Sequence, residues 1–368
     1  MRCTIWIGGA LLCLAGLFIV GWGMIDPHPM RWIAIMALAL YGVLVWAAHG
    51  DVVIDWPIVA VLGYVGVSLT WSPDPYAGSV YYLHWIALCI AFLWARRIGN
   101  LGLLACVAIF VQWCMALNYG PGIYGGLGNE NFQSEFLVIA GALAAHGAPK
   151  YDSSLKANTC LAFAAAAFTQ AIIFNASHAS LAAVGVVMFF AARDWIIRAL
   201  IIAAACLVAY VLRESVIDRF EFAYNTFLIW KDHPIFGYGL GGFDYLYPGY
   251  AEGHIAFTGQ SRMDGLKWYA GAAHNEFIQM LAEFGLVGVG LIATALILYI
   301  RNWLVVMPLA GICLVGFPLQ NPSTALLAAA LLGVASLPTS CPSLSSCWRS
   351  TLGAASWASA SFRRVIAQ

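Results

Sequence analysis

The sequence predicts an all-α protein that crosses a membrane many times, and two observations carry this prediction. Hydrophobic residues make up 62% of the 368 residues and charged residues only 9%, against roughly 25% charged residues in an ordinary soluble domain. Uninterrupted apolar runs recur from Cys3 to Leu337, each near the ~20 residues that one helix needs to cross a bilayer. Barrel strands would instead alternate polar and apolar residues over about ten positions, so the runs indicate helices.

Charges, prolines and glycine-rich turns divide these runs into about twelve expected helices. In chain order they are 3–23, 31–49, 52–71, 80–95, 99–117, 132–147, 157–175, 178–192, 195–212, 275–299, 302–317 and 321–337. The weakest of these boundaries is Asn175–His178, where two apolar stretches nearly fuse.

Basic residues set the expected orientation, because Lys and Arg in short loops are retained in the cytoplasm. An N-terminus inside the cell puts most of them there, namely Arg96, Arg97, Lys150, Lys156, Arg193, Arg198, Arg301, Arg349, Arg363 and Arg364. We therefore expect both termini in the cytoplasm.

The net charge is zero, which excludes the basic surface typical of a nucleic-acid-binding protein. The ten cysteines form no CxxC pair and most lie in apolar runs, so we expect neither a metal site nor a structural disulfide.

The chain divides into five expected regions, which are 1–127 (N-terminal helices), 128–212 (further helices), 213–273 (outer loop), 274–337 (C-terminal helices) and 338–368 (cytoplasmic tail). The outer loop breaks the hydrophobic rhythm, since it concentrates charged residues and is rich in Trp, Tyr, Phe and Gly. Long irregular segments in compact proteins are usually functional or disordered. We expect this one to be irregular and folded against the helices on the periplasmic side.

A glycine-rich stretch, WKDHPIFGYGLGGF at 230–243, lies inside that loop. Glycines such as Gly239 let backbone N–H groups approach an anion closely, which suits a phosphate. A tight or flexible turn explains the same composition.

Polar residues continue where the loop meets the next helix. His274 stands at this boundary, and Asn275, Gln279 and Glu283 follow at a spacing of four, which puts them on one helix face. A polar stripe at the start of a membrane helix is costly unless it faces a cavity or other helices. A histidine at a water-accessible boundary can serve as a base near neutral pH, although a structural role is the commoner one.

Few basic residues fall on the outer side, and five of the six lie in the loop, among them Arg219, Arg262 and Lys267. Arginine presents a planar fork that suits phosphate oxygens. Solvation of the loop, or pairing with its acidic residues, accounts for these charges equally well. A second polar stretch, GGLGNENFQSEF at 125–136, either caps a helix or lines a polar cavity.

Taken together, these motifs make the chain resemble the O-antigen ligase and polymerase superfamily of bacterial membrane glycosyltransferases. HNEFIQMLAEFGLVG at 274–288 is similar to the family's motif of His, then Asn, Ser or Gln, nine residues, Gly, two residues, and a small or aromatic residue. Arg219 and DHPIFGYGLGGF at 232–243 are similar to the upstream elements of that family. GNEN at 128–131 is a weaker match. The chain departs from the pattern at His178, where the family often has arginine, and at Ala223, where it often has tryptophan.

The resemblance implies a GT-C-like glycosyltransferase in the bacterial inner membrane, with its active site at the periplasmic face. It implies an inverting, metal-independent transfer of a glycan from undecaprenyl pyrophosphate to lipid A core or protein, without a cofactor. His274 would bind or deprotonate the acceptor hydroxyl, and Arg219 would hold the pyrophosphate. His178 would be a weak second cation, and Asn275 and Gln279 would position the substrate.

Three other interpretations stay open. A polymerase of the same superfamily would share the local motifs and extend the glycan on its own carrier. A secondary transporter for a small anion would use intramembrane groups such as Glu135, Glu283, His84 and His146, although no internal repeat stands out. An inactive relative would serve assembly or partner binding, as the replacement of arginine by His178 suggests.

Overall fold

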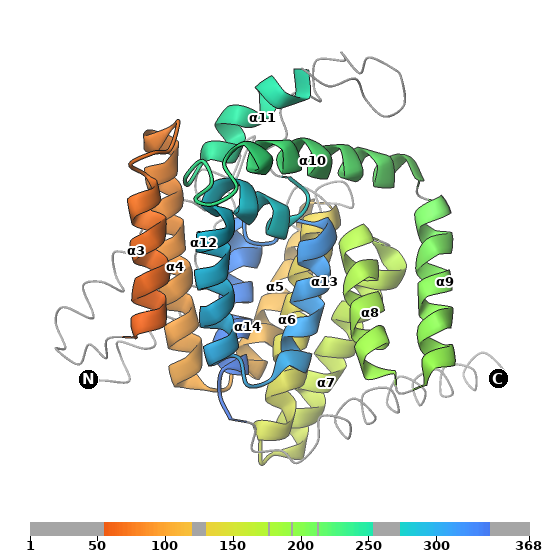
Figure 1. Cartoon of the computed structure of the whole chain (residues 1–368). Helices are drawn as coiled ribbons and strands as arrows, with labels where there is room; N and C mark the ends of the chain where they lie inside the picture. The colour runs from red at the N-terminus through yellow and green to blue at the C-terminus, as the bar shows by residue number, and fades with distance from the viewer. Residues whose placement is uncertain are drawn as a thin grey trace.

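A computed structural model describes residues 55–119, 130–175, 177–192, 194–211, 213–252 and 273–338 of the chain. Within these ranges every regular element is a helix (Figure 1). Its α-helices are α3 (Trp56–Ser68), α4 (Pro75–Ile98), α5 (Gly102–Tyr119), α6 (Glu130–Gly147), α7 (Ser154–Thr169), α8 (His178–Ala191), α9 (Trp195–Val211), α10 (Arg213–Asp232), α11 (Gly242–Glu252), α12 (Glu276–Tyr299), α13 (Trp303–Val315) and α14 (Pro322–Ala335). A 3₁₀ turn (Ala148–Lys150) follows α6, and a π-helical turn (Gln170–Phe174) ends α7.

Each expected span that lies in the described ranges overlaps one of these helices, and the all-α prediction is confirmed there. The expected spans 3–23 and 31–49 and the tail 338–368 lie outside the described residues, apart from residue 338 itself. The boundary at Asn175–His178 is a real break, because the segments Ser154–Ile173 and His178–Phe190 are bent by 119°.

Among the described helices, two are long and apolar enough to cross a membrane, Pro75–Ile98 and Glu276–Tyr299. Counting each of two bent helix pairs as one span brings the number to four, by length and composition alone. The expected number of about twelve crossings therefore stays a prediction.

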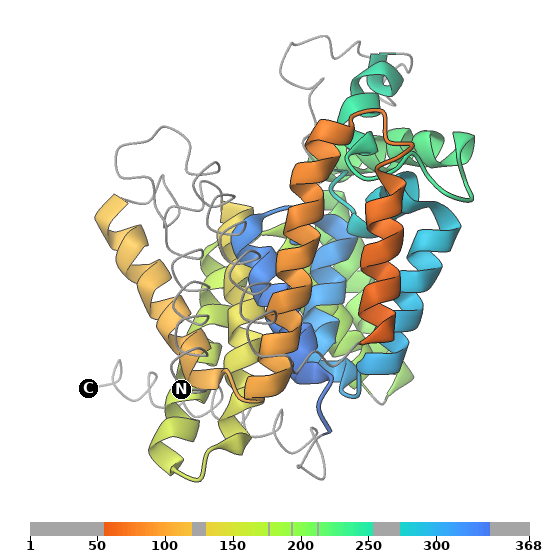
Figure 2. The same cartoon turned by 90° about the vertical axis from the view of Figure 1, so that its left-hand side faces the viewer.

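Upright helices form the body of the molecule, with α3, α4 and α12 standing side by side (Figures 1 and 2). Small residues let the helix backbones approach closely. A Cβ atom added at Gly311 of α13 would lie 2.6 Å from Cα of Ala183 in α8, and one at Gly102 would lie 3.1 Å from Gly147. The largest buried cluster joins α5, α6, α7, α13 and α14 and is rich in alanine.

The segment after Arg213, expected to be irregular, is largely helical where the structure describes it. The 20-residue α10 lies across one end of the upright helices, nearly perpendicular to α9 (Figure 1). Its inner face buries Asn225, Thr226 and Ile229 against α11 and α12. Composition gave no sign of this helix, because charged and aromatic residues are interspersed along it and form no single apolar face.

The glycine-rich turn between α10 and α11 docks against a break in α12. Gly285 has φ 61° and interrupts α12. The freed backbone groups pair with the turn, since Tyr238 N–H donates to the carbonyl of Ala282 (2.9 Å) and Leu286 N–H donates to that of Pro234 (2.9 Å). Re-pairing of this kind is what permits a broken helix in an apolar environment.

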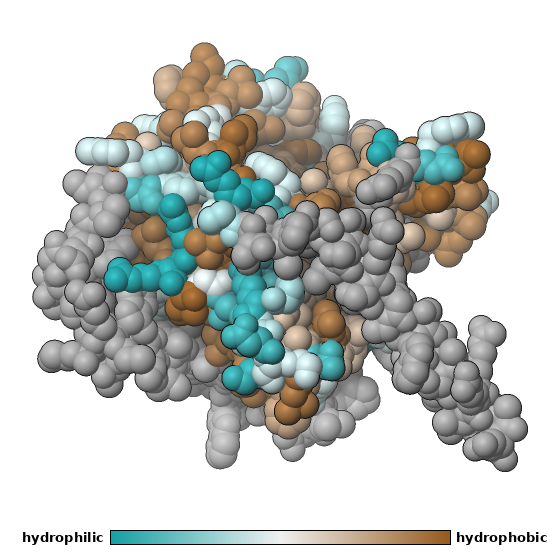
Figure 3. Space-filling model, turned by 90° about the horizontal axis from the view of Figure 1, so that it is seen from below, coloured by the Kyte–Doolittle hydropathy of each residue, from teal (hydrophilic) through white to brown (hydrophobic). Residues whose placement is uncertain are grey.

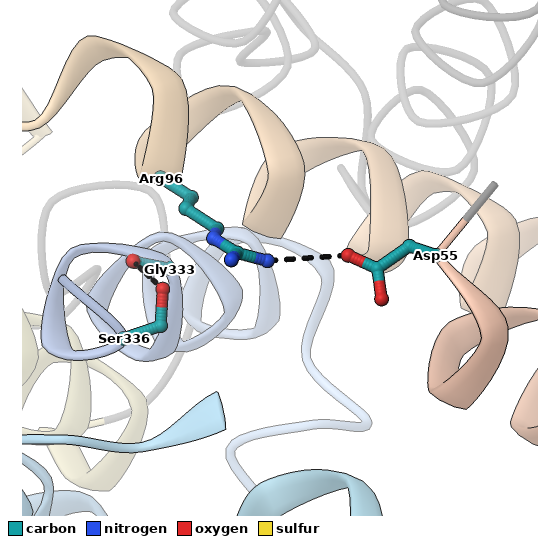
Figure 4. Close-up of polar contacts among 4 residues, drawn as sticks. All are labelled: Asp55, Arg96, Gly333 and Ser336. Atoms are coloured by element: carbon teal, nitrogen blue, oxygen red, sulfur yellow. Dashed lines mark hydrogen bonds and ion pairs between the residues drawn. The ribbon is translucent and has the colours of Figure 1, made fainter. Parts of the chain in front are cut away.

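Basic side chains gather at the end of the bundle opposite α10. Arg96 pairs with Asp55 at 3.1 Å (Figure 4), and the Lys150 ammonium donates to the carbonyl of the residue that caps α4 (2.9 Å). Arg301 lies at the same end, since its backbone N–H donates to the carbonyl of Ala335 (3.0 Å) at the end of α14. Seen from below, hydrophilic residues gather on this end of the molecule (Figure 3). We call it the basic end.

Candidate active site

His274 lies just before α12, held in a backbone conformation that few side chains adopt. Its φ is 52°, and it is the one non-glycine residue with positive φ in the described part of the chain. Its imidazole ring contacts Phe222 of α10 (5.2 Å between ring centres) and Phe317 (4.8 Å, edge to face). Backbone strain of this kind costs on the order of 1–3 kcal/mol and persists where surrounding structure fixes it, often at functional sites.

The neighbours of His274 fix its backbone on both sides. The Asn275 side chain caps α12 by accepting from the N–H of Ile278 (3.1 Å), and its Nδ2 donates to the carbonyl of Leu314 (3.0 Å). Gln279 Oε1 accepts from the N–H of Ala273 (3.0 Å). Asn275 and Gln279 therefore both fix the position of His274. Asn275 does so as the N-cap of α12, and Gln279 does so through its hydrogen bond to Ala273, the residue before His274.

Arg219 reaches the same place from α10. Its Nε donates to the carbonyl of Val315 (3.1 Å). Burial lowers the pKa of the guanidinium, and the nearby carboxyl of Glu135 partly offsets this. The group stays protonated, because arginine is not deprotonated in proteins.

The segment that joins these groups is Leu314–Phe317, at the end of α13, which we call the 314–317 segment. Its four successive residues contact, in order, the Asn275 side chain, the Arg219 side chain, the Glu135 carboxyl and the His274 ring. The sequence reasoning above treated these residues only as the end of an expected span. The one signal in the sequence is GFP at 316–318, where glycine and proline end the apolar run.

The electrostatics keep the His274 imidazole neutral at pH 7. Burial, and then the positive charge of Arg219, lower the pKa of His274 from 6.5 to about 4. A neutral imidazole offers a lone pair that can accept a proton. The site therefore combines a possible proton acceptor with a fixed cation.

The other expected site residues have different positions. His178 is the first residue of α8 and is half-buried. Ala183 of α8 packs against Gly311 of α13, close to the 314–317 segment, so His178 lies at the same end of the bundle as that segment. The N–H of Gly239 donates to the carbonyl of Glu283 (2.8 Å), so an anion-binding role for that group is not supported. Arg262 and Lys267 lie outside the described residues.

The polar face of α12 turns into the protein. Glu276, Gln279 and Glu283 are all buried, and Glu276 Oε1 accepts from the N–H of Leu319 (2.7 Å). They line a cavity of about 20 Å³ together with His84 of α4, large enough for about one water molecule. In the part of the chain that the structure describes, no group of three or more His, Cys, Asp or Glu side chains is arranged to hold a metal ion.

The chain matches no family model. No curated protein matches it either.

Proposed function

We propose that this chain is a glycosyltransferase of the bacterial inner membrane, of the O-antigen ligase type. It transfers a glycan from undecaprenyl pyrophosphate to an acceptor, lipid A core or protein, at the periplasmic face. The observation that carries the proposal is the meeting of His274 and Arg219 on the 314–317 segment. These two side chains are 55 positions apart in the sequence, and they are the two that the reaction needs most.

The shape of the molecule supports a membrane location. α9 has no buried residue, although it is almost wholly apolar, and Trp195 (74%), Leu200 (64%) and Tyr210 (71%) are largely exposed. Exposed apolar surface of this extent marks contact with a membrane or a partner. The basic end lies opposite the candidate site, and the tendency of basic residues to stay in the cytoplasm supports a site at the periplasmic face.

Each step of the proposed reaction has a group to serve it. The acceptor hydroxyl oxygen attacks the anomeric carbon of the donor sugar, and the bond from that carbon to the diphosphate oxygen breaks. The hydroxyl proton passes to the neutral imidazole of His274. The electron pair of the broken bond stays on the diphosphate, where Arg219 stabilises the growing negative charge.

Binding of the donor should raise the pKa of His274, which favours the proposed reaction. In the free protein Arg219 depresses the pKa of His274. A bound diphosphate brings negative charge beside Arg219 and so weakens this effect, which makes the imidazole a stronger base when the donor is present. The donor thereby activates the base that its own reaction uses.

A glycan gel tests the proposal. A host strain that lacks the gene is complemented with the native chain, His274→Ala, Arg219→Ala or Lys231→Ala, and membrane levels are checked by blotting. Lys231 is an exposed cation on the same helix as Arg219 and is the matched control. Native protein and the control should restore a glycan ladder, and the other two variants should leave the glycan on its lipid carrier.

The same gel separates the alternatives. Short ligated units without a ladder in the absence of the gene would identify a polymerase of the same superfamily. The second candidate, a small-anion transporter, draws support from the buried carboxyl groups of Glu135, Glu276 and Glu283, since ionisable groups inside a membrane often mark a transport path. A transporter predicts solute flux that is insensitive to His274→Ala, and a native ladder from both site variants would refute the transferase.

A further inference from the structure

Glu135 is a buried acidic side chain that contacts the 314–317 segment of the candidate site, and the proposed reaction does not use it. It lies in the first half of α6 and is 1% exposed. Its carboxyl accepts a hydrogen bond from the N–H of Phe317, while its Oε2 atom is buried and makes no hydrogen bond to the described residues. Burying a carboxyl group with an unsatisfied oxygen destabilises the folded protein. A role in the site would explain why an acidic residue occupies this position.

Gly316 shows how closely the carboxyl fits the 314–317 segment. A Cβ atom added at Gly316 would lie under 3.0 Å from Glu135 Oε1, a distance that real Cβ atoms essentially never show. The backbone of Gly316 is extended (φ −137°), so conformation does not demand glycine here. The close approach of the Glu135 carboxyl is what requires glycine at this position.

The segment that Glu135 contacts also holds the two reactive groups. Arg219 Nε donates to the carbonyl of Val315, and the ring of His274 packs on the ring of Phe317. A hydrogen bond that holds the Phe317 N–H therefore has two effects. It fixes the Val315 carbonyl that orients the Arg219 guanidinium, and it fixes the Phe317 ring that supports the His274 imidazole. The Glu135 carboxyl is also close enough to Arg219 to act on its charge.

We propose that Glu135 is a positioning residue for Arg219, acting through its hydrogen bond to the 314–317 segment. The inference rests on the proposed function, because it assigns Arg219 to the diphosphate. Correct placement of a cation matters most where charge develops, in the transition state. A displaced Arg219 should therefore lower kcat and leave the KM for the donor almost unchanged.

Four variants test this with purified protein in lipid nanodiscs and a lipid-linked diphosphate donor. Glu135→Asp keeps the carboxyl group but shortens the side chain, and Glu135→Gln keeps the length and an acceptor oxygen but removes the carboxyl group. Gly316→Ala pushes the carboxyl away from the segment. Gly185→Ala is the control, because a Cβ atom at Gly185 meets nothing within 4 Å.

If hydrogen bonding positions the segment, Glu135→Asp and Gly316→Ala should each lower kcat by about tenfold or more, and Glu135→Gln by about threefold. Gly185→Ala should match the native protein. Thermal unfolding of the same samples corrects for unfolded protein, so a purely structural role would lower the melting temperature and leave kcat per folded molecule unchanged.

The results that overturn the proposal differ from those that overturn the function. Native kcat per folded molecule in Glu135→Asp and Gly316→Ala, beside a large loss in Arg219→Ala, removes the positioning role and leaves the transferase standing. A severe loss in Glu135→Gln with native activity in Glu135→Asp also overturns it, because the acidic group itself, rather than the geometry of its hydrogen bond, would then matter. Native activity in Arg219→Ala overturns the proposed function itself.

Discussion

Replacing Arg219 by glutamine should raise the pKa of His274. In the native protein that pKa is lowered from 6.5 to about 4, first by burial and second by the positive charge of Arg219. The substitution removes only the second cause, which is the smaller one. The pKa of His274 should therefore rise by less than half of the way back to its ordinary value.

The size of the native effect follows from the same numbers. One pKa unit corresponds to 1.36 kcal/mol, so a fall from 6.5 to about 4 means that the folded protein disfavours the protonated imidazole by roughly 3 kcal/mol. Because the folded pKa lies below the unfolded one, the contribution of His274 to stability is complete above pH 6.5. It is lost as the pH falls from 6.5 to about 4.

The assay is an NMR titration of protein labelled at the ring carbons of histidine. The chain has 8 histidines, and the signal that disappears in His274→Ala identifies the residue. Inorganic pyrophosphate added to the native protein should raise the pKa of His274 as well, because it offsets the charge of Arg219. A native His274 that titrates near 6.5, or one whose pKa does not respond to Arg219→Gln, would refute this electrostatic reasoning.

Three further substitutions probe the packing that supports the site, each measured by thermal unfolding in detergent micelles. Gly285→Ala should destabilise the protein by more than ~2 kcal/mol, because φ is 61° and a Cβ atom would lie under 3.0 Å from a backbone carbonyl. Gly290→Ala is the control, because the described residues leave open space around Gly290. Equal melting temperatures for the two variants would contradict the prediction. Tyr64→Phe should cost about 1 kcal/mol, since its hydroxyl donates to two carbonyls that hold the glycine-rich turn and α12 together. Arg96→Ala should cost less than ~1 kcal/mol, because its pair with Asp55 is 40% exposed on the arginine side, and a larger loss would show that the basic end stabilises the fold.

Within the described residues, the sequence predicted the helical state of the apolar runs well and the outer loop poorly, and the two results have different physical causes. A long apolar run has few structures open to it other than a helix, so α4 and α12 could be read from composition. α10 has charged and aromatic residues mixed around its circumference, and its helical state depends on the surface that its inner face covers. Only the packing of Phe222 and Ile229 against α11 and α12 decides that.

The site shows the same division. His274, Arg219 and Asn275 could be singled out because residue type and spacing carry information on chemistry. The glycine-rich stretch was open to two interpretations, and the hydrogen bond from Gly239 to α12 supports the tight turn.

What the sequence determined by itself is the helical class, and by residue type and spacing it singled out His274 and Arg219 as candidates. What only the tertiary structure decided is that they meet on the 314–317 segment, with the Glu135 carboxyl against its other side. The reason is physical. Secondary structure follows from local chain chemistry, whereas contact between α6, α10, α12 and α13 depends on how closely four helices pack, and no short-range pattern encodes that distance.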